Sequence, residues 1–198
     1  MSIQTFYTQA ANRDFARVFQ FRLARLANID FKAENHLVYV ETASLPGRQI
    51  NNVPVPYMGL SFNVPGTASY PGSAGYNVTM RCDANYDLRA ALEAATFNTF
   101  NEVNSTGEYS LPNTSFPIIL ELMGKKMEVI REYELVGAYL VSIADAGYDI
   151  KDSGTIQTIQ ATFAYQYWRS NQIVISKYNR TQVKPLAWGG SNETPSVR

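Results

Sequence analysis

The chain has few of the side chains that catalysis, metal binding and membrane insertion use. Among its 198 residues there is one cysteine, Cys82, and one histidine, His36. A lone cysteine excludes an intrachain disulfide, and one cysteine with one histidine cannot supply an ordinary structural zinc site. No apolar run approaches the ~20 residues that span a bilayer, and residues 1–15 lack the layout of a signal peptide. We therefore expect a soluble protein made in the cytoplasm, with no metal, cofactor or membrane insertion.

Catalytic motifs are also missing. No serine lies in a GxSxG-type elbow, no GxxxxGK[ST] or GxGxxG loop is present, and His36 precedes an apolar segment that favours a structural histidine. Glu128, Glu132 and Glu134 remain, because paired carboxylates can act as acid and base. They share one parity of one predicted strand, which favours either a solvated face or an acidic wall that repels a polyanion. We therefore predict that the chain is not an enzyme.

Charge is scarce and unevenly divided along the chain. Charged residues make up 17% of the sequence, and the formal net charge is zero. Residues 102–152 nevertheless hold nine acids and four bases, a balance of −5, whereas residues 153–198 hold one acid and five bases, a balance of +4. Opposite charge on separate regions favours head-to-tail association of identical copies. The 13 tyrosines also favour association of subunits, because subunit interfaces are rich in tyrosine and poor in lysine and glutamate.

The segment 155–168, TIQTIQATFAYQYW, is uncharged and strongly patterned. Apolar and aromatic side chains fall on one parity, and neutral polar side chains fall mostly on the other. A period of two predicts one long strand with an apolar face and a polar face that carries no charge. Such a polar face indicates either contact with another protein surface, where a lone charge is costly to desolvate, or an ordinary sheet surface that uses Thr and Gln.

The rest of the chain predicts further strands and one helix. Alternation indicates strands near residues 16–27, 36–45, 77–83, 118–122 and 127–135, with Val78, Met80 and Cys82 facing inward. A helix capped by Asn85 is expected over 87–100, with an apolar stripe that includes Leu88 and Leu92. The sum is an all-β subunit with one mid-chain helix, an antiparallel sandwich or barrel.

Prolines mark residues 46–66 as an unusual strand pair. Pro46 and Gly47 predict a turn, and Pro54 and Pro56 interrupt the extended residues that follow. Because proline cannot donate to a sheet ladder, it is confined to edges, bulges and strand starts. We therefore expect an edge or a projecting hairpin here.

Four stretches of the chain resemble the major tail tube protein of contractile-tailed bacteriophages: residues 13–26, 41–66, the mid-chain helix and 134–168. The motifs are ASLPG followed by VPVPYMG, and LVGAYLVSI followed by a polar loop and TIQTIQATFAYQYW. The resemblance implies a six-fold ring whose subunits contribute strands to one inner β-barrel. Rings then stack into a tube around a tape measure protein and inside a sheath, and the DNA later passes through. Type VI secretion tubes share this fold.

The resemblance also implies roles for particular residues. Glu128, Glu132 and Glu134 are expected to face the lumen, and the hairpin with Pro46, Gly47, Pro54, Pro56 and Tyr57 is expected to reach the adjacent ring. Residues 1–168 form the tail tube domain, and 169–198 continue as a basic C-terminal arm that departs from the family pattern. The expected partners are further copies, the sheath, the tape measure, the baseplate, the tail terminator and double-stranded DNA. The expected location is the virion tail, assembled in the host cytoplasm.

Three alternatives stay open at this point. The C-terminal arm leaves room for a tube initiator at the baseplate, and the shared fold leaves room for the tube of a contractile secretion system. A third alternative, from another class, is a glycan-binding β-sandwich in which aromatic side chains stack on sugars, but Trp168 and Trp188 are not grouped with acidic or amide partners in an obvious loop.

Overall fold

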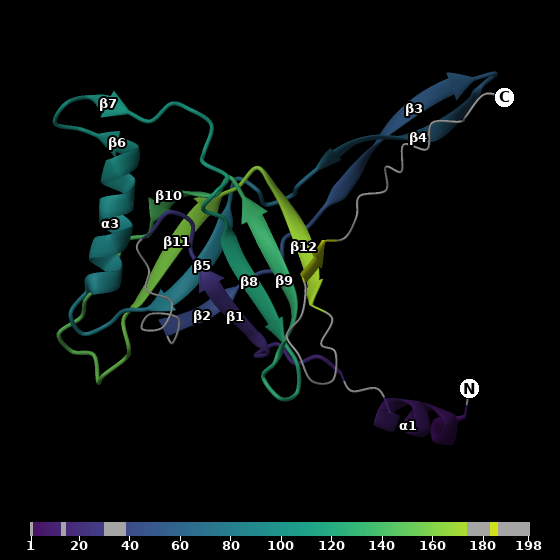
Figure 1. The fold of residues 1–198 in the computed structure, drawn as a ribbon, viewed down its shortest axis with the longest axis horizontal. Coiled ribbons are helices and arrows are strands. Elements are labelled where there is room, and N and C mark those ends of the chain that lie inside the picture. The colour runs from purple at the N-terminus through teal and green to yellow at the C-terminus, as the bar shows by residue number, and fades with distance from the viewer. Residues whose placement is uncertain (1, 13–14, 30–38, 174–182, 186–198) are drawn as a thin grey trace.

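The described part of the chain consists of two facing sheets from which a hairpin and a short helix project (Figure 1). The computed structural model describes residues 2–12, 15–29, 39–173 and 183–185. His36 and most of the predicted C-terminal arm lie outside these residues. All strand pairings between the described strands are antiparallel, as the sequence predicts.

The first sheet, sheet A, has five strands and carries one wall of the core. Its order is β1 (Phe21–Arg25), β8 (Ile118–Met123), β9 (Val129–Val136), β12 (Tyr167–Ile173) and β13 (Val183–Pro185). Leu23, Leu120 and Leu135 are buried on its inner face, while the alternate residues face outward. The first strand is shorter than predicted, because Phe19 precedes it and is exposed.

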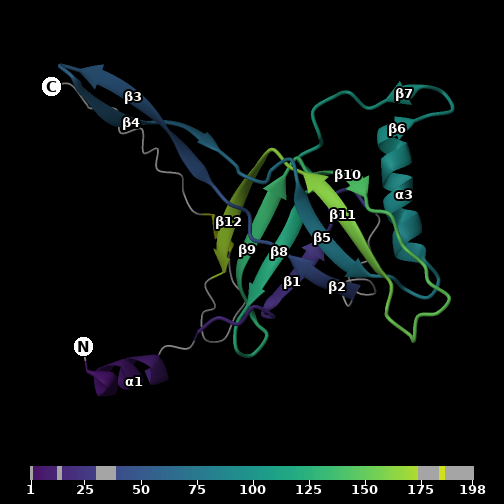
Figure 2. The same cartoon turned by 180° about the vertical axis from the view of Figure 1, so that it is seen from behind.

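The second sheet, sheet B, has four strands and supplies the opposite wall. Its order is β10 (Tyr139–Ile143), β11 (Thr158–Ala164), β5 (Tyr76–Arg81) and β2 (Val40–Ala43). Val78 and Met80 are fully buried as predicted, and Cys82, just past β5, is half-buried against the core. Figure 2 shows the two sheets from behind, with their strands crossing at an angle. The sandwich predicted from the sequence is therefore confirmed.

The uncharged segment 155–168 is not one strand. Its alternation holds in β11, where Ile159 and Phe163 are buried and Gln160 is exposed. The chain then leaves sheet B: the N–H of Tyr165 donates to the Ser73 carbonyl at 2.7 Å, and residues from Tyr167 onward pair with β9 in sheet A. The sequence pattern does not reveal this switch, because aromatic side chains keep the odd parity as far as Tyr167, whereas in β12 the even residue Trp168 packs against the core and Tyr167 is exposed. Strand β12 also continues past Trp168, so that residues 169–173 of the predicted arm belong to the body.

The mid-chain helix α3 (Asp87–Thr99) lies beside β10 at one end of sheet B. Leu88 and Leu92 are buried, as its apolar stripe predicts. Its first turn is capped by Asp83, whose carboxylate accepts from the N–H groups of Asp87 and Leu88 at 3.0 and 3.1 Å. The prediction that Asn85 caps this helix is therefore wrong.

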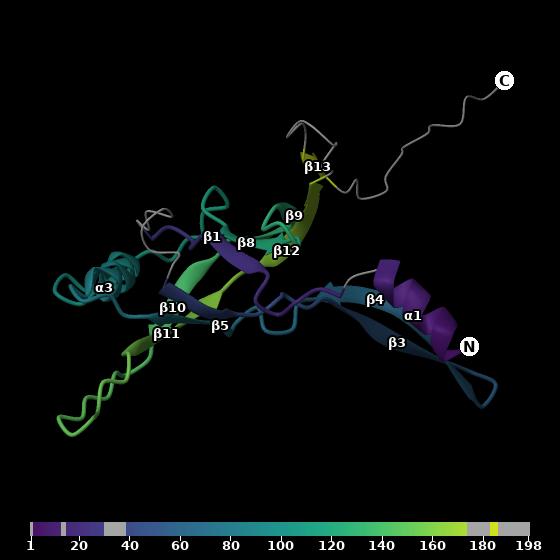
Figure 3. The same cartoon turned by 90° about the horizontal axis from the view of Figure 1, so that it is seen from below.

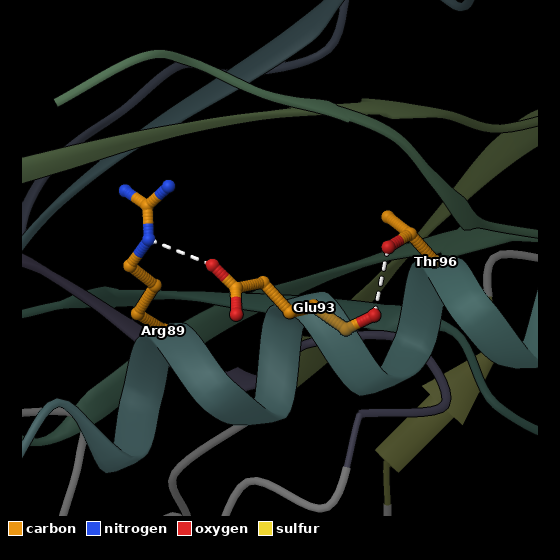
Figure 4. A network of polar contacts seen from close by, with 3 residues as sticks. All are labelled: Arg89, Glu93 and Thr96. Atoms are coloured by element: carbon orange, nitrogen blue, oxygen red, sulfur yellow. Dashed lines mark hydrogen bonds and ion pairs between the residues drawn. The ribbon is translucent and has the colours of Figure 1, made fainter.

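Polar contacts join three half-buried residues along one side of α3 (Figure 4). Arg89 Nε donates to Glu93 Oε1 at 2.8 Å, an i,i+4 ion pair, and the Thr96 hydroxyl donates to the Glu93 carbonyl at 2.7 Å. Phe97 and Phe100 are exposed rather than part of the buried stripe. Beyond the helix, a small hairpin pairs β6 (Phe100–Asn101) with β7 (Thr106–Gly107).

A second helix, α1 (Ile3–Asn12), corrects the prediction of a single helix. The Ser2 hydroxyl caps it by accepting from the N–H of Thr5 at 3.2 Å. Its apolar residues have helical spacing, which was a signal in the sequence, and they are Ile3, Phe6, Tyr7 and Ala10. No helix in the described ranges is both long and apolar enough to cross a membrane.

Candidate functional site

The most unusual surface of the molecule is the hairpin of β3 (Gln49–Tyr57) and β4 (Leu60–Ser69), which we name the ribbon. It extends away from the two-sheet body (Figure 1), and every residue from Gln49 to Ala68 is exposed, while Ser69 at its base is half-buried. The predicted projecting hairpin is thus confirmed. Residues 49–69 contain no charged side chain.

The two faces of the ribbon differ in polarity. Cross-strand pairs join Val53 to Val64, Val55 to Phe62 and Tyr57 to Leu60. Directly opposed residues in an antiparallel pair point to the same face, and residues two apart return to that face. The six side chains therefore form one continuous surface, the apolar ribbon face, and each is 45–64% exposed. The other face carries Pro54, Pro56 and amide or hydroxyl side chains. An isolated two-stranded hairpin is marginal in water, so a partner on the apolar ribbon face would stabilise it.

Two glycines shape the ribbon. At its tip, Met58 and Gly59 have φ values of 47° and 80°, the positive pair that a type I′ turn requires and that matches strand twist. Near its base, a side chain at Gly66 would meet the Val53 side chain at 2.7 Å and the Asn51 carbonyl at 2.9 Å. This close approach accompanies a register shift between Ile50 and Asn52.

Two aromatic side chains fasten the residues that lead into the ribbon. The Trp168 indole N–H donates to the Gly47 carbonyl at 2.8 Å, and the Tyr76 hydroxyl donates to the Ser44 carbonyl at 2.8 Å. Trp168 also packs against Tyr133, with ring centroids 5.6 Å apart. Burial, and then the neighbouring Tyr165, raise the pKa of the Tyr76 phenol, so it stays a hydrogen-bond donor. Trp168 is therefore a structural residue here and not an open platform for a sugar.

The outer face of sheet A carries two of the three glutamates that the resemblance assigns to a lumen, Glu132 and Glu134, together with other charged residues. Register places Arg22, Glu121, Glu132 and Asn171 in one row across β1, β8, β9 and β12. Arg22 Nε donates to Glu121 at 2.7 Å. In the next row, Glu134 accepts from Arg169 Nε at 2.6 Å and from the Asn171 amide at 3.1 Å. The face thus holds three carboxylates and two guanidiniums, a smaller acidic excess than the sequence alone suggests.

Glu128 does not belong to this face. It lies in the β8–β9 turn, where its carboxylate accepts from the N–H of Lys126 at 2.8 Å and packs against Gly124. The structure therefore brings Glu132 and Glu134 together and separates Glu128 from them. Glu121, Arg22 and Arg169 complete the cluster and were not predicted, because only cross-strand register brings them into these rows.

Glu132 is the glutamate of this cluster whose pKa is raised. Burial raises its pKa above the ordinary value of 4.5, and the nearby carboxylates of Glu134 and Glu121 raise it further. Burial and the neighbouring acids thus make ionisation of Glu132 less favourable than that of a glutamate in water. No set of three His, Cys, Asp or Glu side chains in the described ranges is arranged to hold a metal ion.

A cleft of about 780 Å³ lies between α3, residues 108–113 and the end of β10. Ile29, Phe116 and Leu140 line its apolar part, while Asn98 and Gln166 line its polar part. Glu108 is the one acid among its lining residues, which include no lysine, arginine, histidine or cysteine. This composition offers no acid–base pair and no nucleophile with an adjacent base.

We compared the chain with protein families, with curated proteins and with solved structures. No protein-family model matches the chain. The tail tube protein gp19 of Enterobacteria phage T4 is 23% identical over 158 residues, which cover 78% of this chain and 91% of gp19.

Solved structures share the fold. A chain of the anti-feeding prophage baseplate, 6-fold symmetrised, aligns with a TM-score of 0.58 and 12% identity over 82% of this chain and 99% of that chain. A chain of the sheath-tube complex of the extracellular contractile injection system PVC, in the extended state, aligns with a TM-score of 0.50 and 13% identity. That alignment covers 87% of this chain and 99% of that one.

Proposed function

We propose that this chain, a homologue of the phage T4 tail tube protein gp19, is a structural protein whose copies form the inner tube of a contractile tail. The relationship spans most of both chains, and the fold is that of contractile injection system components. The observation that carries the proposal is the ribbon: 21 residues without a charge, projecting from the body with an uncovered apolar face. A surface of this kind is typical of a protein–protein interface.

Six copies form a ring in this proposal. Sheet A ends at β1 and β13 and sheet B ends at β10 and β2, so each sheet presents strand edges that a neighbouring copy can extend. Joining edges around a ring closes a barrel and removes the unpaired backbone groups. The six-fold symmetry comes from the resemblance and agrees with the symmetry stated for the anti-feeding prophage baseplate.

The outer face of sheet A lines the lumen in this proposal. Its acidic excess is suited to a channel for DNA, because carboxylates repel phosphates and prevent them from binding to the wall. Glu132 and Glu134 are the predicted lumen residues on this face, and Glu128 lies at the rim of the sheet in the β8–β9 turn. Charge reversal by Glu132→Lys is expected to leave rings intact and to slow DNA ejection. An unchanged ejection rate would argue against the lumen assignment.

The ribbon reaches the adjacent ring in this proposal. Pro46 and Gly47 turn the chain out of the body, and Pro54 and Pro56 lie on the ribbon face opposite Tyr57. Prolines remove backbone donors from the ladder, which discourages further strands from adding to it. The contact between rings is thus made by side chains of the ribbon, with Tyr57 at its outer end.

Further partners follow from the same proposal. A tube inside a contractile tail contacts a sheath outside, a tape measure protein inside, a baseplate at one end and a terminator at the other. Its place is the virion tail, assembled in the host cytoplasm, and it needs no catalysis. Residues 174–198, with bases Lys177, Arg180, Lys184 and Arg198, add a contact to a neighbouring ring or to the sheath. A truncation after Ile173 that changed neither tube length nor sheath binding would contradict that role.

A second candidate is the tube of a contractile injection system that delivers protein rather than DNA. The likeness to the sheath-tube complex of an extracellular contractile injection system favours it. The cargo separates the two candidates, because particles purified from the source would contain either DNA in an attached head or no head at all. A role as tube initiator at the baseplate would restrict the protein to one end of each particle, which antibody labelling detects.

Electron microscopy of the purified chain tests the proposal, with sedimentation velocity on the same sample. We expect rings or hollow rods of uniform width. A protein that stays monomeric up to about 1 mM, where even an association free energy of about −4 kcal/mol is visible, would contradict it.

A further inference from the structure

Helix α1 and the ribbon are two regular elements of the described chain whose apolar faces are uncovered. Ile3, Phe6 and Tyr7 of α1 are 88%, 59% and 76% exposed, and together with Ala10 they recur at the spacing of one helix face. Both elements project from the same side of the body, opposite α3 (Figures 1 and 3), and Figure 1 shows that they lie apart within one copy. Neither covers the apolar face of the other in the single chain.

The two faces match in charge. Residues 2–12 and residues 49–69 contain no Asp, Glu, Lys or Arg, although 34 of the 198 residues of the chain are charged. Packing these elements together therefore desolvates no side-chain charge. The polar sides match in the same sense: α1 presents Gln4, Thr5, Thr8 and Gln9 away from its apolar face, and these can stay in contact with water or with other neutral groups.

The two faces also match in size. The ten residues of α1 span about 15 Å at 1.5 Å per residue. The apolar ribbon face runs from Val53 to Tyr57, about 14 Å at 3.4 Å per residue, and is two strands wide. A helix laid along this face can therefore cover its whole length.

The connection to the body allows α1 to reach another molecule. Eight residues, 13–20, separate the end of α1 at Asn12 from the start of β1 at Phe21. Residues 17–20 form a turn, in which the N–H of Gln20 donates to the Arg17 carbonyl at 3.0 Å, so residues 13–16, at most about 14 Å of chain, connect α1 to that turn. Helix α1 is therefore held outside its own body, where a second copy can contact it.

We infer that α1 of one copy docks its apolar face on the apolar ribbon face of a second copy. The inference rests on the proposed function, because it requires neighbouring copies, and it assigns the occupant of the ribbon. Phe6 and Tyr7 are the anchors, and Val55 and Phe62 form the centre of the surface they contact. The contact ties copies together by exchanging a terminal helix, so that each copy both gives a helix and receives one.

Matched charge variants test the energetic side of this inference. Phe6→Glu places a carboxylate in the contact, and Thr8→Glu places the same charge on the opposite side of α1. We expect Phe6→Glu to raise the protein concentration needed for assembly about tenfold or more, as for truncation of an interface anchor, and Thr8→Glu to change it less than about twofold. Equal effects of the two variants, or no effect of Phe6→Glu, would overturn the inference.

Photo-crosslinking identifies the partner directly. Unlabelled chains carry p-benzoylphenylalanine in place of Tyr7 and are co-assembled with ¹⁵N-labelled chains of unaltered sequence. Trypsin cuts after Arg48 and Arg81, so the ribbon lies in the peptide 49–81. We expect the adduct on the labelled form of that peptide. Adducts confined to other peptides, or to the unlabelled peptide of the same copy, would overturn the inference.

The same experiment separates this inference from the proposed function. Tubes that form but lack the labelled 49–81 adduct would overturn the helix exchange and leave the tube intact. An unaltered chain that forms no assembly would overturn the tube, and the helix exchange with it.

Discussion

The body and the ribbon are both antiparallel and both alternate apolar with polar residues, but they differ in what covers the apolar side. In the body, Phe163 of β11 is fully buried between the two sheets. In the ribbon, Phe62 of β4 has the same side chain on the same kind of strand and is 53% exposed. The body satisfies its apolar face within one chain, and the ribbon does not. Burial in the body therefore supports folding, and the equivalent surface on the ribbon remains for association.

Charge follows the same division. The outer face of sheet A meets solvent with ion pairs such as Arg22–Glu121 and Arg169–Glu134. The ribbon, which is also exposed to solvent in the single chain, carries no charged side chain on either face. A charge that stays hydrated costs little on a free surface, whereas it must be desolvated in an interface. This difference agrees with the proposed tube, in which the outer face of sheet A meets water and the ribbon meets protein.

The largest expected effect comes from breaking the body. Phe163→Ala leaves a cavity between the sheets and is expected to lower the free energy of unfolding by about 3–5 kcal/mol. The matched change Phe62→Ala in the ribbon is expected to lower it by less than about 0.5 kcal/mol, because the side chain is exposed in the single chain. Urea unfolding of the unassembled protein measures both. Similar losses for the two phenylalanines would contradict the division between body and ribbon.

The next effect concerns assembly rather than folding. Phe62→Glu puts a charge in the middle of the apolar ribbon face and is expected to weaken assembly tenfold or more, about 1.4 kcal/mol or above. Asn63→Glu puts the same charge on the other ribbon face and serves as the control, with a smaller expected effect. Pelleting of assembled rods against protein concentration gives both values. The melting temperature of the unassembled chain should not distinguish the variants.

A smaller effect is expected where the ribbon joins the body. Trp168→Phe removes the indole N–H that bonds the Gly47 carbonyl and is expected to cost about 1 kcal/mol of stability. The ring still packs against Tyr133, so the core should keep its shape. Thermal unfolding measures the loss, and hydrogen exchange near residue 47 should rise. Unchanged exchange there would show that this bond does not fix the base of the ribbon.

The smallest effect concerns the charged face. Because the pKa of Glu132 is raised in the folded chain, its contribution to stability is full below the ordinary value of 4.5 and is lost as pH rises through the folded value. Glu132→Gln is therefore expected to raise the melting temperature slightly at pH 7 and to have no such effect below about pH 4. Glu102→Gln, at an exposed loop residue, is the control. Destabilisation by Glu132→Gln at pH 7 would contradict the repulsion between the three glutamates.

Local patterns were enough to predict much of this fold. Alternation identified the buried residues Val78 and Met80, and the prolines at 54 and 56 identified the ribbon, because each signal depends on a few adjacent residues. The switch of the chain from β11 to β12 was not predicted, because both strands keep a period of two while they pair with different sheets. Helix α1 was not predicted either, because no charged residue marks its ends. Ser2 and the helical spacing of Ile3, Phe6 and Tyr7 are the signals in the sequence that indicate it.

The candidate site was predicted less completely than the fold. Glu132 and Glu134 share a parity in the sequence and a face in the structure, so that part of the prediction followed from local spacing. Glu128 has the same parity but lies in a turn, because Met127 adopts a φ of 58° and ends the alternation. Glu121 and Arg169 join the cluster only through cross-strand register, which depends on the whole sheet.

Hydrogen–deuterium exchange of the chain before and after assembly tests the central claim most directly, because it reports on body and ribbon in one experiment. The amides of β8 and β11 should be protected in both states, since the core is complete in one chain. The amides of residues 49–69 should exchange rapidly in the single chain and become at least about tenfold slower in the assembly. A ribbon that exchanges equally fast in assembled tubes would contradict the claim that this surface joins the copies.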